Sequence, residues 1–235
     1  MNHQRPTRRL ALAIALALMF MAAHSIPQTH AEPETAASDQ DSEIVVARLT
    51  YDKGKTAVCF AEQFLTTYAR ETGQNVRRDY EQVALSSEDL FEYPFVVFSG
   101  QEAFTLSDKE KENLKRYVER GGFVLASAGC SNNAWSRSFE AVFTAVFGED
   151  QLAGLDTDHA LFHTVYDIDH VDVSKPGGRD PIQAMVTDGR VRVLYSPLGL
   201  NDTGNAGGDC CCCGGSEIKN ARLINVNALG YALTR

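Results

Sequence analysis

Residues 93–127 have the sequence YPFVVFSGQEAFTLSDKEKENLKRYVERGGFVLAS, in which a short apolar run stands at each end. Such continuous runs are typical of strands that are covered on both faces. Between them, Ser107 and Glu110 have the spacing of a capping box, which predicts a helix that ends at Gly121-Gly122. A strand, a helix and a strand in this order predict two parallel strands joined by a crossover helix.

The segments around this unit repeat the alternation of strand and helix. Asp188-Gly189 lies between two apolar runs, at 182–187 and 190–196, and predicts a β-hairpin. The sequence therefore predicts one α/β domain over residues 44–235, with a layered, mostly parallel sheet, a C-terminal hairpin and a last helix. The other expected elements are strands at 44–51 and 75–85 and helices at 57–71, 134–147 and 216–233.

The chain begins with a predicted export signal, residues 1–31. Three arginines precede an uncharged apolar stretch at 10–23, and small residues follow, so we expect cleavage near Ala31. The apolar stretch is shorter than the roughly 20 residues that a membrane-spanning helix needs. A periplasmic or secreted protein is therefore expected. The pair Arg8-Arg9 leaves both the general and the twin-arginine export routes open.

The exported part is acidic. Residues 32–43 (EPETAASDQDSE) lack aromatic and bulky apolar side chains and predict a disordered tether. No acidic residue precedes Glu32 whereas three arginines do, so the exported part keeps 19 basic residues against 31 acidic ones, a formal charge of −12. This charge argues against nucleic acid as a partner and against anionic lipid. We expect no membrane insertion of the mature domain.

From residue 44 onward the chain contains, in this order, the segments ARLTYD (47–52), DLFEYPFVVFSG (89–100), LSDKEKENLKRYVERGGFVLA (106–126), SFEAVF (138–143), DHALFHTVYDI (158–168) and INVNALGYALT (224–234). This order of segments resembles the bacterial family catalogued as domain of unknown function 4159. The resemblance implies a fold similar to class I glutamine amidotransferases and to trehalose-utilisation-type proteins, with a flavodoxin-like layered sheet. It implies no particular activity.

Four adjacent cysteines, Cys210, Cys211, Cys212 and Cys213, lie in a glycine-rich loop before the last helix. Thiolates suit soft or borderline metals, so zinc, copper or an iron–sulfur cluster is the first hypothesis. The spacing is not that of a zinc finger, and we expect about two of the four to reach one ion. Cys130 or the histidines of the DHALFH segment would complete such a site. Disulfide pairing with redox exchange, and passive packing, remain open as alternatives.

Cys130 is the second candidate, because it follows the buried run at 123–127 in a predicted strand-to-helix turn. The amidotransferases that the family resembles place their nucleophilic cysteine in such a turn. His159 or His163 would then act as the base. The sequence departs from the amidotransferase pattern, since no His-x-Glu pair follows late in the chain. The acidic residues expected to orient the base are Asp156, Asp158 and Asp167.

Gly100, Gln101 and Glu102 follow the central predicted strand. In doubly wound sheets, ligands bind in the crevice beyond the carboxyl ends of the strands, so these residues are candidates for contact with a ligand or cofactor. The alternative is an exposed turn without a binding role.

These patterns leave three hypotheses for the function. The first is a metal- or redox-active binding protein that uses the cysteine run. The second is a cysteine-nucleophile hydrolase or amidotransferase-like enzyme that uses Cys130, and the third is a non-catalytic module that docks an envelope protein. The sequence names no small-molecule ligand and leaves open whether the protein is an enzyme. It contains no P-loop, no H-E-x-x-H and no G-x-S-x-G motif.

Overall fold

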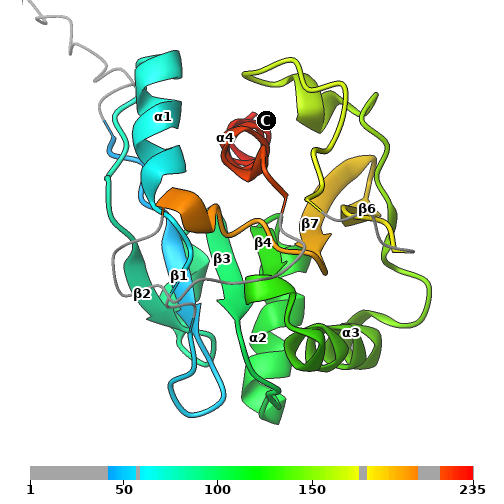
Figure 1. Ribbon diagram of the computed structural model, residues 1–235. Helices are drawn as coiled ribbons and strands as arrows, with labels where there is room; N and C mark the ends of the chain where they lie inside the picture. Colours follow the sequence, from blue (N-terminus) through cyan, green and yellow to red (C-terminus); the bar gives the residue numbers. More distant parts are fainter. Residues whose placement is uncertain (1–41, 57–58, 175–178, 206–217, 235) are drawn as a thin grey trace, which may run out of the picture. The chain divides into compact units, whose positions relative to one another are not determined.

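The computed structural model describes residues 42–56, 59–174, 179–205 and 218–234 (Figure 1). The export signal, nearly all of the tether and the run Cys210–Cys213 lie outside these residues. Everything described belongs to one compact unit. Within it, no helix combines the length and the apolar character needed to cross a membrane.

Seven strands form one sheet in the order β2-β1-β3-β4-β7-β6-β5. The pairs among β2, β1, β3, β4 and β7 are parallel, whereas β6 and β5 are antiparallel to their neighbours. The predicted hairpin is confirmed as β6 and β7, and β7 also joins the parallel sheet beside β4. The strands are β1 Ala47–Thr50, β2 Glu81–Ala84, β3 Phe95–Gly100, β4 Phe123–Ala128, β5 Ala153–Gly154, β6 Gln183–Thr187 and β7 Arg190–Ser196.

Helices cover both faces of the sheet: α1 and α4 pack on one face, and α2 and α3 pack on the other (Figure 1). Their bounds are α1 Gln63–Thr72, α2 Asp108–Glu119, α3 Asn133–Phe147 and α4 Ala221–Leu233. Four short 3₁₀ turns complete the described chain, namely η1 Glu88–Glu92, η2 Gly129–Ser131, η3 Ala160–His163 and η4 Thr203–Asn205.

Alternate side chains of the central strands enter two separate cores. Along β3, Phe95 and Val97 pack with α1 and α4, whereas Val96 and Phe98 pack with α2 and α3. Every residue of β3 and of β4 is buried. Covering on both faces therefore explains why the two runs are continuously apolar rather than alternating with polar residues.

The capping box of α2 is confirmed and extends beyond the helix. The Ser107 side chain accepts a hydrogen bond from the Glu110 N–H, and Glu110 Oε2 accepts one from the Ser107 N–H at 2.7 Å. Glu110 Oε1 also accepts from the backbone N–H of Asp52 at 3.0 Å. A single, nearly buried carboxylate thus fixes both the start of α2 and the loop that follows β1.

Substitution Glu110→Ala removes the acceptor of two backbone N–H groups, so we expect the free energy of unfolding to fall by about 1–3 kcal/mol. Urea denaturation of the two proteins measures this. The matched control is Glu112→Ala on the exposed side of the same helix, which should stay within about 0.5 kcal/mol of the parent. Equal losses in the two variants would contradict the structural role of Glu110.

Candidate functional site

The chain reverses its direction of winding between β1 and β3. The α1 helix leaves β1 on one face of the sheet, and the α2 helix leaves β3 on the other face. At such a switch point the two loops diverge and leave a crevice beyond the carboxyl ends of the strands. A cavity of about 290 Å³ lies there. It is lined by Tyr51, Gly54, Lys55, Thr56, Gly100, Gln101 and Glu102, so the structure places the three residues 100–102 in its wall.

A buried hydrogen-bonded chain lies at the base of this cavity. Trp135 Nε1 donates to Tyr51 Oη at 2.8 Å, and Tyr51 Oη donates to the carbonyl of Ser99 at 2.9 Å. Burial raises the pKa of the Tyr51 hydroxyl well above its ordinary value, so this group remains a neutral donor. A Cβ at Gly100 would lie 2.6 Å from Trp135 Nε1, so this close packing requires glycine.

A lysine joins the two loops that border the cavity. Lys55 Nζ donates to the carbonyl of Ala103 at 2.6 Å and lies 3.0 Å from Asp52 Oδ2. The hydrogen bond from Lys55 holds the pKa of the Asp52 carboxyl below its ordinary value. The lining of the cavity thus includes an ammonium group, a carboxylate and a side-chain amide, from Lys55, Glu102 and Gln101.

Three serines form a buried row at the carboxyl edge of the sheet. Ser99 of β3 pairs in register with Ser127 of β4, and Ser127 pairs with Ser196 of β7. All three are fully buried. The site residues predicted from the sequence did not include this row, although a signal for it exists: the three apolar runs FVVFS, FVLAS and RVLYS all end in serine.

Asn201 lies in the loop that follows β7, and its side chain forms hydrogen bonds with two of the three serines. Its Oδ1 accepts from Ser127 Oγ at 2.5 Å, and its Nδ2 donates to the carbonyl of Cys59 at 3.1 Å and approaches Ser99 Oγ at 3.4 Å. The backbone carbonyl of Asn201 accepts from the N–H of Ala61 at 3.0 Å. One buried asparagine therefore connects β3, β4 and the segment that leads into α1.

The two described cysteines lie in segments that follow the carboxyl ends of strands, Cys59 after β1 and Cys130 after β4. Cys59 is 4 % exposed, whereas Cys130 is half-buried, and each is disulfide-bonded. Gln101 Nε2 donates to Cys130 Sγ at 3.3 Å, so this sulfur lies beside the wall of the cavity. Cys130 (φ 54°) and Ser131 (φ 53°) both have left-handed backbone conformations. Such strain in residues other than glycine is common at functional sites.

The predicted partners of Cys130 lie at the amino ends of the parallel strands, whereas Cys130 lies beyond the carboxyl end of β4. The ring of His159 is 5.7 Å from that of Tyr231, whose hydroxyl accepts from the N–H of Val191 at the start of β7. Tyr231 also contacts Phe123, the first residue of β4. Cys130 follows the opposite end of β4, about 17 Å of strand away. The structure therefore places His159 and Cys130 at opposite ends of β4, and the role of His159 as a base stays a prediction.

His163 is held near His159 and away from the cavity. It is exposed, its Nδ1 pairs with Asp167, and its Nε2 lies 2.8 Å from the carbonyl of Thr157. Asp167 therefore contacts His163 at the amino ends of the strands, whereas Cys130 follows the carboxyl end of β4. The sequence alone did not reveal this separation, because the position of the long segment between β5 and β6 is fixed by its packing on α4 rather than by a local pattern.

No group of three or more His, Cys, Asp or Glu side chains is arranged to hold a metal ion among the described residues. The disulfide bond of Cys130 engages the sulfur that was expected to complete a metal site. The four cysteines at 210–213, on which the metal hypothesis rests, lie outside the described residues.

The family model described as "Domain of unknown function (DUF4159)" matches residues 45–233. The chain belongs to this family. The match includes every strand of the sheet, both described cysteines and Asn201, so the site lies within the family domain. A search of curated proteins finds no match. The family description assigns no activity, so the function has to be inferred from the geometry of the site.

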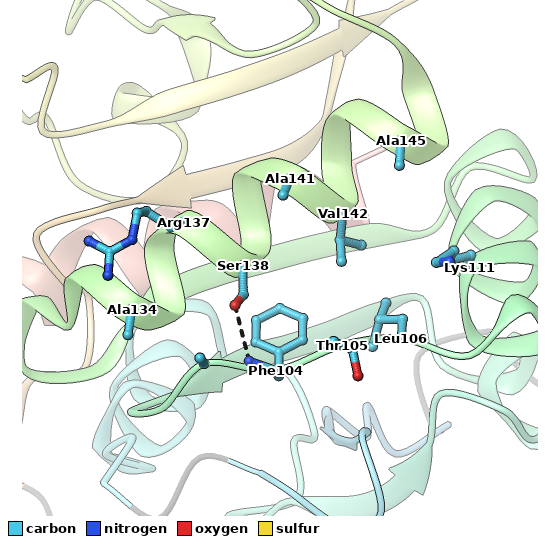
Figure 2. Close-up of a pocket in the computed structure, with 11 residues that line it drawn as sticks. Phe104, Thr105, Leu106, Lys111, Ala134, Arg137, Ser138, Ala141, Val142 and Ala145 are labelled. Atoms are coloured by element: carbon cyan, nitrogen blue, oxygen red, sulfur yellow. Dashed lines mark hydrogen bonds between the residues drawn. The ribbon is translucent and has the colours of Figure 1, made fainter.

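A second cavity, of about 430 Å³, lies between α3 and the loop after β3. Figure 2 shows Ala141 and Val142 of α3 facing Phe104 and Leu106 across it, and Ser138 Oγ accepts a hydrogen bond from the Phe104 N–H at 3.0 Å. The described residues that line it include no carboxylate, histidine or cysteine. Its polar side chains are those of Lys111, Arg137, Ser138 and Thr105, and the rest of the described lining is mostly apolar.

The pKa values of His159 and His163 are shifted in opposite directions. The hydrogen bond to Asp167 raises the pKa of His163, so its contribution to stability is present below pH 6.5 and is lost as the pH rises through the folded pKa. Burial lowers the pKa of His159, so its effect is the reverse: stability falls as the pH drops below 6.5.

Titration of the histidine ring signals by NMR measures both values. We expect a midpoint above 6.5 for His163 and below 6.5 for His159. Asp167→Asn should lower only the midpoint of His163. A shift of both midpoints in this variant would mean that the two rings are coupled and that their environments are not independent.

Proposed function

We propose that this chain is an exported thiol–disulfide redox protein, periplasmic or secreted, in which Cys130 is the sulfur that exchanges. One observation carries the proposal: a disulfide-bonded, half-buried sulfur accepts a hydrogen bond from Gln101, a residue that lines the switch-point cavity. A thiolate released at this position would keep the amide donor, which stabilises its negative charge.

Exposure and strain favour Cys130 over Cys59 as the site of attack. A thiolate that attacks a disulfide needs access to the sulfur, and Cys59 is nearly fully buried. The left-handed conformations of Cys130 and Ser131 persist because the surroundings hold them: Ser131 Oγ donates to the carbonyl of Leu198 at 2.6 Å. Strain of this kind costs on the order of 1–3 kcal/mol per residue and marks positions where geometry serves a function.

The exchange uses an external dithiol as the reductant. Its first thiolate attacks Cys130 Sγ and forms a mixed disulfide, while the electron pair of the broken S–S bond leaves on the partner sulfur of the protein. Its second thiolate then attacks the mixed disulfide and releases the Cys130 thiolate. The dithiol ends as a disulfide, and the protein has gained two electrons. Oxidation by a disulfide follows the same steps in reverse.

The chain has six cysteines, so Cys59 and Cys130 bond either to each other or to members of the run Cys210–Cys213. An oxidising compartment outside the cytoplasm suits either arrangement. We also propose that cysteines of the run, when reduced, hold a soft metal such as zinc, copper(I) or an iron–sulfur cluster. The support for this is their number and adjacency, because thiolates prefer such ions.

Graded reduction of the native protein by dithiothreitol, followed by iodoacetamide and peptide mass spectrometry, tests the redox proposal. We expect Cys130 to be labelled first, before the protein unfolds. Gln101→Ala should slow the alkylation of reduced Cys130 about fivefold, because it removes about 1 kcal/mol of thiolate stabilisation. The control Gln151→Ala, an exposed glutamine far along the chain, should leave the rate unchanged. Disulfide bonds that resist reduction until the protein unfolds would instead be structural.

Elemental analysis tests the metal proposal independently. Protein purified without chelator and without air should contain a stoichiometric soft metal, and replacement of Cys210–Cys213 by serine should abolish it. The same variant shows by mass spectrometry whether Cys130 loses its disulfide partner. A metal-free protein whose folding is unchanged in the serine variant would overturn this proposal and leave the redox proposal standing.

A second candidate function, a cysteine-nucleophile hydrolase or amidotransferase-like enzyme, is favoured by the backbone of Cys130. A strained residue between a parallel strand and a helix resembles the nucleophile elbow of hydrolases. The strand order β2-β1-β3-β4-β7 also agrees with a flavodoxin-like doubly wound sheet. This function needs reduced Cys130 and a base other than His159 or His163. An electrophilic substrate analogue would then form a stable adduct on Cys130, whereas a module that only docks a partner would form none.

A further inference from the structure

Three arginines converge on a cavity at the amino edge of the sheet, opposite the cysteines. Arg120 follows α2, and Arg190 and Arg192 belong to β7. The cavity has a volume of about 560 Å³, and its wall includes the aromatic rings of Phe91, Tyr93 and Tyr117. The described part of the lining therefore contains three guanidinium groups, several aromatic rings and no carboxylate.

Contacts with uncharged groups hold these arginines in place. Arg192 Nη1 donates to the carbonyl of Gly121 at 2.9 Å, and Arg190 Nη2 donates to the carbonyls of Tyr231, at 3.1 Å, and Thr234. The guanidinium of Arg190 also lies 5.0 Å from the centre of the Tyr231 ring. Each of the two guanidiniums uses a single nitrogen for these hydrogen bonds. Among the described residues no acceptor takes their remaining N–H groups, which can therefore bind a ligand.

Arg120 is exposed, and its guanidinium lies 4.7 Å from the centre of the Phe91 ring. In the part of the chain that the structure describes, none of the three arginines forms an ion pair. Other arginines do: Arg77, Arg116 and Arg222 each pair with a carboxylate. The chain has 31 acidic residues against 22 basic ones. A cavity with three arginines and no carboxylate among its described lining residues is therefore unusual for this acidic protein.

We propose that this cavity binds a small, multiply charged oxyanion, of the phosphate or polycarboxylate class. Arginine presents a planar fork of N–H groups that matches the oxygens of either anion. Rings on the cavity wall lower the local dielectric and strengthen this attraction. The site is distinct from the proposed redox site, because it lies at the start of β4 and β7 whereas Cys130 follows the carboxyl end of β4.

Isothermal titration of the purified protein with inorganic phosphate, pyrophosphate and citrate tests the proposal. We expect saturable binding of at least one of these probes, weakened by added salt. The double variant Arg190→Gln, Arg192→Gln should weaken binding at least tenfold. Arg137→Gln, which removes an exposed arginine outside this cavity, should leave it unchanged. Comparing phosphate with citrate distinguishes the two ligand classes.

Arg120→Gln provides a variant whose folding is not in question, because this side chain is exposed and forms no hydrogen bond with the described residues. It should weaken binding about threefold while the circular dichroism spectrum stays the same. Equal affinity in the parent and in both cavity variants would overturn the proposal, as would the absence of binding to all three probes. Binding only to vesicles of phosphatidylglycerol would also overturn it, because the site would then be a membrane surface contact.

Discussion

The hydrogen bonds that Asn201 makes to a buried row of serines hold the carboxyl edge of this sheet together. Phe95 and Phe123 stack at the amino end of the core beneath α1 and α4, and the next-to-last row of the same two strands, before Gly100 and Ala128, is Ser99 and Ser127. A buried hydroxyl without a partner costs about 1–3 kcal/mol, so such a row is stable only if another polar group covers it. Asn201 is that group for Ser99 and Ser127, whereas Ser196 Oγ accepts from the N–H groups of Leu198 and Gly199.

The candidate functional residues of this domain lie at two opposite ends of its parallel strands. All carboxyl ends of the central strands lie at one edge, which therefore contains the switch-point cavity, the serine row and the two disulfide-bonded cysteines. The amino edge contains His159, packed on Tyr231, and the arginine cavity. The strands between the edges are rigid and buried, so an anion at the arginines would not touch the sulfur of Cys130.

Local patterns predicted most of the fold and little of the site. The unit from β3 to β4 was predicted with its capping box, because a strand run, a cap and a Gly-Gly stop are all encoded within a few residues. Strand β5 was not predicted, because it has two exposed residues and no apolar pattern. Asn201 lies 142 residues from Cys59 in sequence, and no local pattern reports contacts of that range. For the same reason the hypothesis from the sequence placed His159 and His163 beside Cys130, although their segment packs against the C-terminal end of α4.

The way in which Asn201 holds Cys59 bears directly on redox exchange. Its amide binds the backbone carbonyl of Cys59 rather than the sulfur, and Asn225 Nδ2 in turn holds the carbonyl of Leu200 at 2.8 Å. None of these hydrogen bonds depends on the oxidation state of a cysteine. In the proposed redox function, opening of the disulfide would remove one covalent link, and the hydrogen bonds of Asn201 and Asn225 would still hold the core.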